Sequence, residues 1–161
     1  MTGDEKALIA QLEAEEQELV FSRFDNTDAW NLGSAMVAAA TERSLPVTID
    51  IRRHGHLLFH VALAGTTADN DAWIERKVNV VDRFGASSYL VGRRLVASGT
   101  ALDEALGVEP ARFAAHGGAF PIRIADVGVI GTVTVSGLPQ SDDHAFATEM
   151  IRTFLADQTQ L

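Results

Sequence analysis

The chain has 161 residues, a formal net charge of −9 and no cysteine. Phosphate groups repel an acidic protein, so the charge argues against a nucleic-acid or membrane partner. The absence of cysteine excludes disulfides, thiolate metal sites and thiol nucleophiles. The first residues carry no secretion signal, and no apolar run approaches the roughly 20 residues that span a bilayer. We therefore expect a cytoplasmic protein with one domain at residues 1–161.

Two helices are predicted in the N-terminal part of the chain. Residues 4–18 combine a thin apolar stripe with acidic faces, which is typical of a helix packed on its own domain or against another subunit. A short edge strand is expected at residues 19–24. The polar cluster at residues 25–28 predicts the start of the second helix, which ends before Pro46. Its buried face is predicted to comprise Trp30, Gly33, Met36, Val37 and Ala40.

Residues 46–63 alternate in the manner of a β-hairpin. A two-residue turn at 54–55 would place the apolar residues of the two strands on opposite faces. We therefore predict a three-residue turn at 53–55, with Gly55 in the left-handed conformation and an associated bulge. The other face would meet solvent or line a site, because it is largely polar. It carries Thr48, Asp50, Arg52, His56, Leu58 and His60.

Two helices are predicted in the middle of the chain. The first covers residues 68–84 and ends at Gly85, where a positive φ is expected. Its expected buried positions are Trp73, Val80, Val81 and Phe84. Ser87 or Ser88 caps the next helix, which continues to about residue 97. A short helical turn is expected at residues 101–106.

The C-terminal third reads as two paired strands and a helix. Residues 120–124 and 127–135 alternate with a period of two, and we predict an even-length turn at residues 125–126. Ser141 is expected to cap the final helix. The apolar stripe of that helix is predicted to be Phe146, Ala147, Met150, Ile151 and Phe154.

The five histidines do not predict a metal site. His56 and His60 share a strand face, but four residues at ~3.3 Å each place them roughly 13 Å apart, too far to bind one ion. His54 and His56 lie at a turn, with no cysteine or helical histidine pair to complete the ligands. We expect no metal to be bound.

Two other groups of residues suggest a ligand. In His116-Gly117-Gly118 the glycines allow the backbone to approach a ligand closely, although a tight turn with an exposed histidine is an equal alternative. Arg76 and Arg83 lie seven residues apart and so share a helix face. With Ser87, Ser88 and Tyr89 they would hold a carboxylate or phosphate. The alternative is a solvated face, or salt bridges to another subunit.

Several segments resemble one known family, the GlcG/HbpS-like group that carries the label "haem-degrading domain". They are DNDAWIERKVNVV (69–81), RFG (83–85), SSY (87–89), IDIRR (49–53), HGGAFPI (116–122) and GTVTVSGLPQ (131–140). The resemblance covers nearly the whole chain. It implies an α/β (α+β) fold of profilin-like or PAS-like type, with a central antiparallel sheet flanked by helices. It also implies a dimer or a ring of dimers. Haem is implied by the group label only, and no axial-ligand motif can be assigned to a residue.

From these patterns we expect an oligomeric cytosolic protein that binds a small anionic ligand, with haem or another tetrapyrrole among the candidates. One alternative is a haem-degrading enzyme in which His116 or His60 holds the iron. Another is an interaction module without catalysis. No catalytic residue is assigned. The candidate ligand-binding residues are His60, Trp73, Arg76, Lys77, Arg83, Ser87, Ser88, Tyr89, His116, Gly117 and Gly118.

Overall fold

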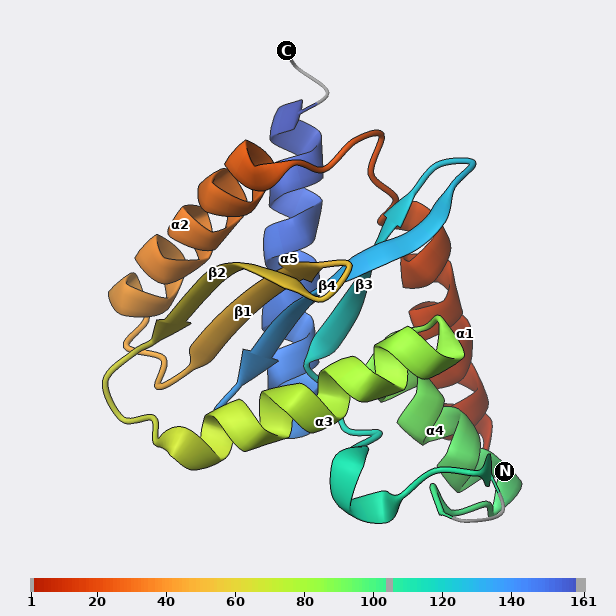
Figure 1. Ribbon diagram of the computed structural model, residues 1–161. Helices are drawn as coiled ribbons and strands as arrows, with labels where there is room; N and C mark the ends of the chain where they lie inside the picture. Colours follow the sequence, from red (N-terminus) through yellow and green to blue (C-terminus); the bar gives the residue numbers. More distant parts are fainter. Residues whose placement is uncertain (1, 104–105, 159–161) are drawn as a thin grey trace.

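The computed structural model describes residues 2–103 and 106–158 (Figure 1). In chain order, the elements are α1 (Gly3–Glu18), α2 (Asn26–Glu42), β1 (Thr48–Arg53), β2 (His56–Ala62), α3 (Ala68–Phe84), α4 (Ser88–Ser98), the 3-10 helix η2 (Pro110–Arg112), β3 (Ala119–Ile124), β4 (Gly128–Ser136) and α5 (Gln140–Gln158). None of these helices is long and apolar enough to cross a lipid bilayer.

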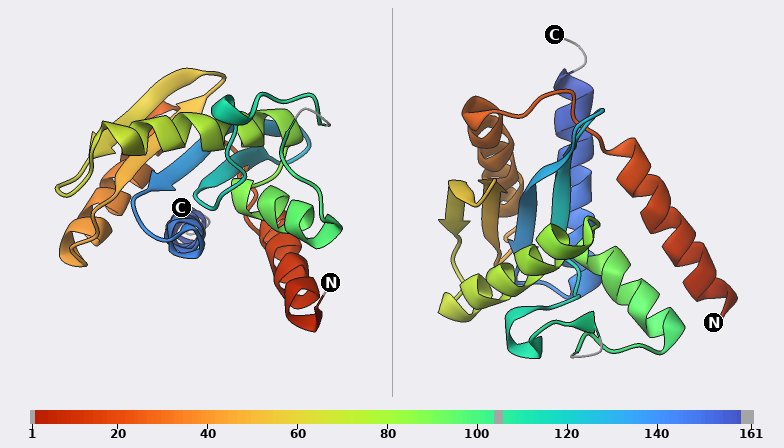
Figure 2. Two further views of the ribbon diagram at one scale, coloured as in Figure 1. Left: turned by 90° about the horizontal axis from the view of Figure 1, so that it is seen from below. Right: turned by 45° about the vertical axis from the view of Figure 1, so that its right-hand side comes forward.

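The strands form one antiparallel sheet with the order β2-β1-β4-β3. Helix α3 runs across one face of the sheet, while α2 and α5 cover the other (Figure 2). Helices α1 and α4 pack against each other on the β3 side of the sheet. This is the helix-flanked antiparallel α+β fold predicted from the sequence.

The sheet face toward α2 and α5 is apolar. Alternate residues of β1, β3 and β4 point into this core and are fully buried, which is the main source of hydrophobic stabilisation. From the strands these are Ile49, Ile51, Phe120, Ile122, Val133 and Val135. Leu32 and Met36 of α2 and Ile151 of α5 complete the packing from the helices.

The opposite sheet face is polar, yet it is also buried. Five of its residues on β1 and β4 are at most 3% exposed, because α3 lies over them. They are Thr48, Asp50, Thr132, Thr134 and Ser136. Helix α3 contributes both apolar residues and Lys77 to this layer. A buried polar layer requires hydrogen-bond partners, and it is here that candidate sites are to be sought.

The β1–β2 hairpin differs from the prediction in its turn. The turn has two residues, His54 and Gly55, with φ values of 51° and 75°. The three-residue turn was therefore wrong. The register instead shifts within the strands, between the pairs Ile51–Phe59 and Arg52–Leu57. Ile49 and Ile51 still pair with Val61 and Phe59, so these apolar residues share one face as predicted. Beyond the irregularity the faces are reversed, and Leu58 rather than Leu57 packs on the core.

The β3–β4 turn also differs. Residues 125–127 separate the strands, so the loop is odd in length rather than even, and the register shifts between Ile122 and Arg123. Asp126 adopts a φ of 63° in this loop. The apolar residues still share a face, because Phe120 pairs with Val133.

Three aromatic side chains that were predicted to be buried are not. Trp30 is 65% exposed, Phe84 is 36% exposed, and Trp73 is only partly buried. In α2 the buried stripe is centred on Leu32, and in α3 it includes Ile74. The helical period was correct, but the direction of each stripe depends on where the sheet lies.

Two boundaries were also wrong. Helix α5 begins at Gln140, so Ser141 lies inside its first turn and is not the cap. The segment at residues 19–24 forms a single parallel bridge, Phe21 to Ile124, rather than a strand. The helical turn predicted at residues 101–106 lies partly outside the described residues.

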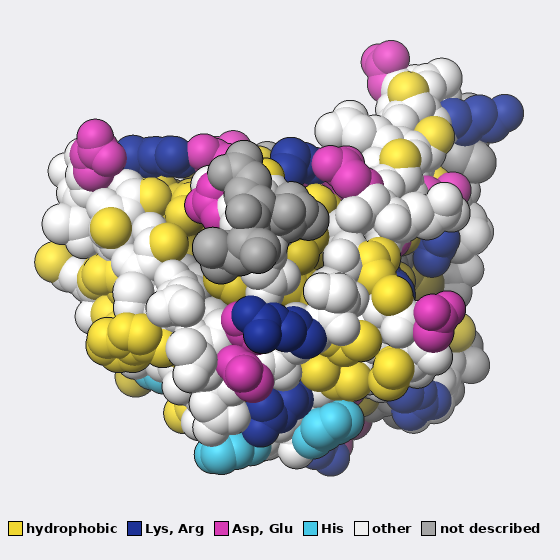
Figure 3. Space-filling model, turned by 90° about the horizontal axis from the view of Figure 1, so that it is seen from above, with side chains coloured by type: hydrophobic (Ala, Val, Ile, Leu, Met, Phe, Trp, Pro, Cys, Tyr) yellow, Lys and Arg dark blue, Asp and Glu magenta, His cyan; other side chains and the backbone are white. Residues whose placement is uncertain are grey.

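Charged side chains of both signs are interspersed on the upper face of the molecule (Figure 3). On the face shown in Figure 3, acidic and basic groups are interspersed with hydrophobic ones. The net charge of −9 is therefore not collected into one patch on that face.

Gly131 tests the packing of β1 against β4. A Cβ at this position would meet the carbonyl oxygen of Arg52, a backbone atom that cannot move aside. We expect Gly131→Ala to lower the free energy of unfolding by about 1–3 kcal/mol, measured by urea denaturation. Gly3→Ala is the control, because nothing lies within 4 Å of its Cβ position. Equal stability of the two variants would contradict the described strand pairing.

Candidate functional site

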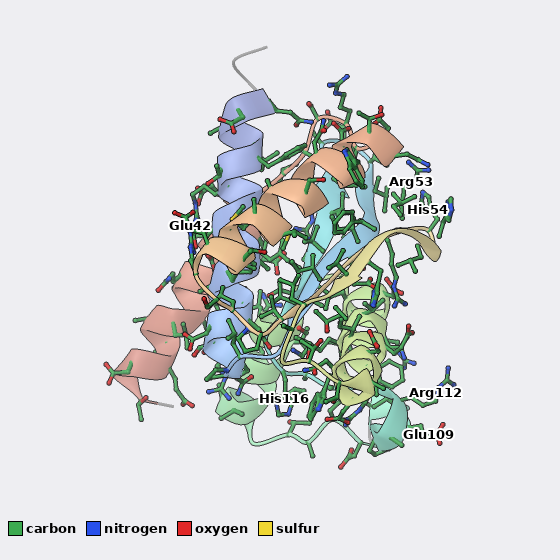
Figure 4. The ribbon with its side chains drawn as sticks, turned by 90° about the vertical axis from the view of Figure 1, so that its left-hand side faces the viewer. Glu42, Arg53, His54, Glu109, Arg112 and His116 are labelled. Carbon is green, nitrogen blue, oxygen red and sulfur yellow. The ribbon has the colours of Figure 1, made fainter. Side chains whose placement is uncertain are left out.

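A cavity of about 250 Å³ lies where the first half of α3, the loop before β3 and the β4–α5 junction meet. Its walls include Trp73, Lys77, His116, Ser136, Gln140 and Asp143. Figure 4 shows His116 at the opposite end of the molecule from Arg53 and His54 in the hairpin turn. The cavity shares Lys77 and Ser136 with the polar layer beneath α3.

Two glycines allow the loop before β3 to reach this position. A Cβ on Gly117 would collide with the backbone of Gln140, and one on Gly118 would lie 2.7 Å from the Nζ of Lys77. Gly118 also has a φ of 140°, which favours glycine. The Gly117 amide donates to Gln140 Oε1 at 3.1 Å, and the Gly118 carbonyl accepts from the amide of Val135 at 3.0 Å. The glycine pair therefore fixes His116 beside α3 and α5.

The floor of the cavity contains a buried ion pair. Lys77 is 3% exposed, and its Nζ donates to Asp143 Oδ2 at 3.1 Å and to the carbonyl of Val135 at 3.2 Å. Asp143 also accepts from the amide of Leu138 at 2.9 Å. Burial lowers the pKa of Lys77, against the opposing effect of Asp143. Burial likewise raises the pKa of Asp143. Both shifts favour the uncharged pair.

Positive charge gathers at the rim around His116, where Arg76 and Arg93 lie beside the cavity, although its wall also carries Asp69. The rings of His116 and Trp73 lie 5.4 Å apart, and the guanidinium of Arg76 lies over the Trp73 ring at 4.7 Å. The guanidinium of Arg93 lies 5.8 Å from the Tyr89 ring. Burial lowers the pKa of His116, and the charges of Lys77, Arg76 and Arg93 lower it further. The imidazole is therefore neutral at pH 7 and surrounded by positive charge.

Both arginines of the rim have unused donors. The Nε atoms of Arg76 and Arg93 are buried, and neither has a hydrogen-bond partner within the described part of the chain. Arg76 uses one Nη to donate to the carbonyl of Phe113 at 3.4 Å. Buried donors are normally satisfied, so these two groups are suited to an anion.

The structure gathers seven of the predicted site residues around this cavity. Three come from α3, one from α4 and three from the loop before β3. Trp73, Lys77 and His116 line the cavity, and the other four lie next to residues that line it or to one another. They are Trp73, Arg76, Lys77, Tyr89, His116, Gly117 and Gly118.

The other four predicted residues lie elsewhere. His60 lies in β2, where Nδ1 contacts Asp50 and Nε2 contacts Asp71, both at 2.8 Å. Arg83 is near the C-terminal end of α3 and donates to the carbonyl of Leu106 at 3.0 Å. The remaining two, Ser87 and Ser88, hold the N-terminal end of α4 in place.

Ser87 and Ser88 are both buried. The Ser87 hydroxyl caps α4 by accepting from the amide of Leu90 at 3.1 Å. The Ser88 hydroxyl accepts from the amide of Ala119 at 3.1 Å, which ties α4 to the start of β3. Their hydroxyls thus already have protein partners.

Sequence reasoning missed several residues of the cavity. The largest omission is Asp143, which reads as an ordinary acidic residue in the first turn of a helix. Arg93 was not among the predicted site residues, and Ser136 and Gln140 were named only within the family-like segment 131–140. The run Ser136-Gly137-Leu138-Pro139 between the last strand and the last helix was the available signal, since loops often carry ligand-binding groups.

No metal site accompanies the cavity in the described ranges. Within residues 2–103 and 106–158, no group of three or more histidine, aspartate or glutamate side chains could hold an ion.

Comparison with known proteins identifies the family. Residues 24–152 match the family model described as haem-degrading protein HbpS-like. The chain belongs to the HbpS-like family. A UPF0303 protein of Streptomyces coelicolor is similar over 149 residues, at 54% identity, covering 92% of this chain and 94% of that protein.

Solved structures of the HbpS-like fold agree. The crystal structure of the Ybr137w protein superposes with a TM-score of 0.85 at 33% identity, covering 94% of this chain and 89% of that chain. A PduOC–haem complex superposes with a TM-score of 0.67 at 19% identity, covering 80% and 93%. The second similarity supports the fold alone.

The electrostatics of the rim can be measured at His116. A positive charge destabilises the imidazolium, so removing one should raise the pKa of His116 toward its ordinary value of 6.5. We expect Arg76→Gln and Arg93→Gln each to raise it, as followed by NMR titration of the ring protons. Arg83→Gln, on the same helix as Arg76 but away from the cavity, should leave it unchanged. A His116 pKa that is insensitive to both rim variants would contradict the described arrangement.

Proposed function

We propose that this HbpS-like protein is a cytoplasmic homo-oligomer that binds a small anionic ligand at the cavity beside His116. The proposal is carried by the two buried Nε donors of Arg76 and Arg93, which have no partner in the described residues. By contrast, five other arginines are each paired with a carboxylate, as Arg123 is with Glu16 at 3.0 Å; they are Arg43, Arg52, Arg94, Arg123 and Arg152. The rim therefore holds positive charge that an anion would neutralise.

The size of the cavity favours a small ligand. Its volume of about 250 Å³ lies below the range of roughly 300–1,000 Å³ that is usual for drug-sized ligands. Polar groups dominate its walls, with the Trp73 ring as an apolar surface. A short mono- or dicarboxylate would place its charge at the arginines and its carbon chain against Trp73.

Haem is the second candidate, favoured by the family description and by His116. A neutral, accessible imidazole is a common haem ligand. The arginines of the rim would then hold the propionates. A cavity of about 250 Å³ is too small to enclose a macrocycle. Haem would therefore fit only outside the cavity, against His116 and the two arginines.

Calorimetry with acetate, succinate and phosphate tests the first candidate. We expect one saturable site for at least one of these anions, weakened about tenfold by Arg76→Gln or Arg93→Gln, since a charged hydrogen bond contributes about 1.5–3 kcal/mol. Arg83→Gln is the matched control and should bind as the wild type does. Binding should strengthen as the pH falls, because a bound anion raises the pKa of His116.

The haem candidate has a separate outcome. A Soret band that is lost in His116→Ala, with no saturable binding of the small anions, would replace the first candidate by the second. If neither anion nor haem binds, the cavity is not a ligand site and the interaction module remains.

The homo-oligomer proposal rests on the edge strand β2. Its outer edge has no partner strand in the part of the chain that the structure describes. It contains no lysine, proline or acidic residue of the kind that protects exposed edges. Leu57 of β2 is 50% exposed, and Trp30 of α2 is 65% exposed, with its ring centroid 6.0 Å from that of Phe59 in β2. An antiparallel strand pairs with its own copy about a two-fold axis, which gives a closed dimer.

Trp30→Lys should dissociate this dimer. A charge in an apolar interface is costly, so we expect the mass measured by native mass spectrometry to fall to that of a monomer. Val127→Lys is the control, because Val127 is 71% exposed but lies in the β3–β4 turn, at the other side of the sheet. An unchanged oligomer in Trp30→Lys would exclude this interface.

A further inference from the structure

Lys77 is in an unusual environment for a lysine. It lies in the middle of α3 on the side toward the sheet, and its ammonium reaches a carbonyl of β4 and a carboxylate of α5. A lysine is seldom fully buried unless it is paired. Replacing a buried ion pair with apolar residues is often neutral or stabilising, so stability alone gives a weak reason for this pair.

The environment of Nζ leaves one position open. An ammonium has three donors, and in residues 2–103 and 106–158 Nζ makes two protein hydrogen bonds, to Val135 and Asp143. The side chain also lines the cavity. A small molecule in the cavity can therefore approach Nζ.

Burial also favours the nucleophilic form of this lysine. It lowers the pKa of Lys77 and raises the pKa of Asp143, so the proton of the pair is displaced toward the carboxylate. Desolvated lysines of this kind form Schiff bases with carbonyl compounds.

We propose that Lys77 forms a reversible imine with a small aldehyde or 2-oxo acid, whose carboxylate lies at the arginine rim. This inference rests on the proposed anion site. It adds that the ligand also carries a carbonyl group, which reacts with Lys77 at the floor of the cavity. Asp143 supplies the proton transfers, because its carboxylate contacts Nζ at 3.1 Å.

The reaction balances within the pair. The Nζ lone pair attacks the carbonyl carbon, and the carbonyl oxygen takes the proton of the Asp143 carboxyl group. Asp143 then removes a proton from the new ammonium centre, which gives a neutral carbinolamine. It returns that proton to the hydroxyl, the C–O bond breaks, and water leaves as the C=N bond forms. The product is an iminium ion paired with the Asp143 carboxylate, in place of the original ammonium.

The chain contains an internal control for this reaction. It has two lysines, Lys77 and Lys6, and Lys6 is exposed on α1. Wild-type protein is incubated with glyoxylate or pyruvate and sodium cyanoborohydride, and the adduct is located by peptide mass spectrometry. We expect Lys77 to be modified at least about tenfold faster than Lys6, although it is the less accessible of the two. Acetate, added as a competitor for the anion site, should slow the modification of Lys77 and leave that of Lys6 unchanged.

Lys77→Arg cannot form an imine, and we expect this variant to lose the adduct. Binding of acetate and succinate is measured on the wild-type protein, so that the anion site is judged separately from the imine. Modification of Lys6 at a rate equal to or above that of Lys77 in the wild type would overturn the imine proposal. If the anions still bind in that case, the anion site stands without it. If Lys77 is modified selectively but the small anions neither bind nor compete, the arginine rim is not the carboxylate site.

Discussion

The ion pair between Lys77 and Asp143 holds α3 in place on the polar face of the sheet. It joins α3 to α5, and through the carbonyl of Val135 it joins both to β4. Removing one partner of a buried pair leaves the other polar group buried without its partner, which costs about 3–5 kcal/mol. Helix α3 therefore cannot slide along the sheet without losing these contacts. The cavity, the position of the glycine pair and the orientation of His116 all follow from this placement.

A second group of charges lies between α3 and the β1–β2 hairpin, and its composition differs from that of the group around His116. There, Asp50 is fully buried and accepts from Arg52 Nε at 2.7 Å and lies 2.8 Å from His60 Nδ1. Arg52 also pairs with Glu75 at 2.6 Å. Positive and negative groups match in this network, so it reads as a structural contact. Around His116 the positive groups exceed the negative ones, and that excess distinguishes a ligand site from a structural network.

Family membership has a definite but limited meaning here. Identity of 54% across nearly the whole of a UPF0303 relative leaves no doubt about common ancestry and architecture. The relation to a haem complex at 19% identity transfers the fold, because function depends on particular side chains in a site. In this chain those side chains form a small polar cavity with a cationic rim, which suits a compact acid better than an enclosed macrocycle.

The sequence by itself determined most of the secondary structure, because the signals are local. Gly85 ends α3 in the left-handed conformation with φ 70°, and Ser87 caps α4, both as predicted. Period-two alternation located the strands, and seven of the eleven predicted site residues do lie around one cavity. The tertiary structure alone decided which face of each helix is buried, and so placed Trp30 in solvent and Lys77 in the interior. It also paired Asp143 with a lysine 66 positions away, a contact that no local pattern encodes. Periodicity specifies that a helix has a buried side, whereas the groups that side meets depend on the folding of distant segments.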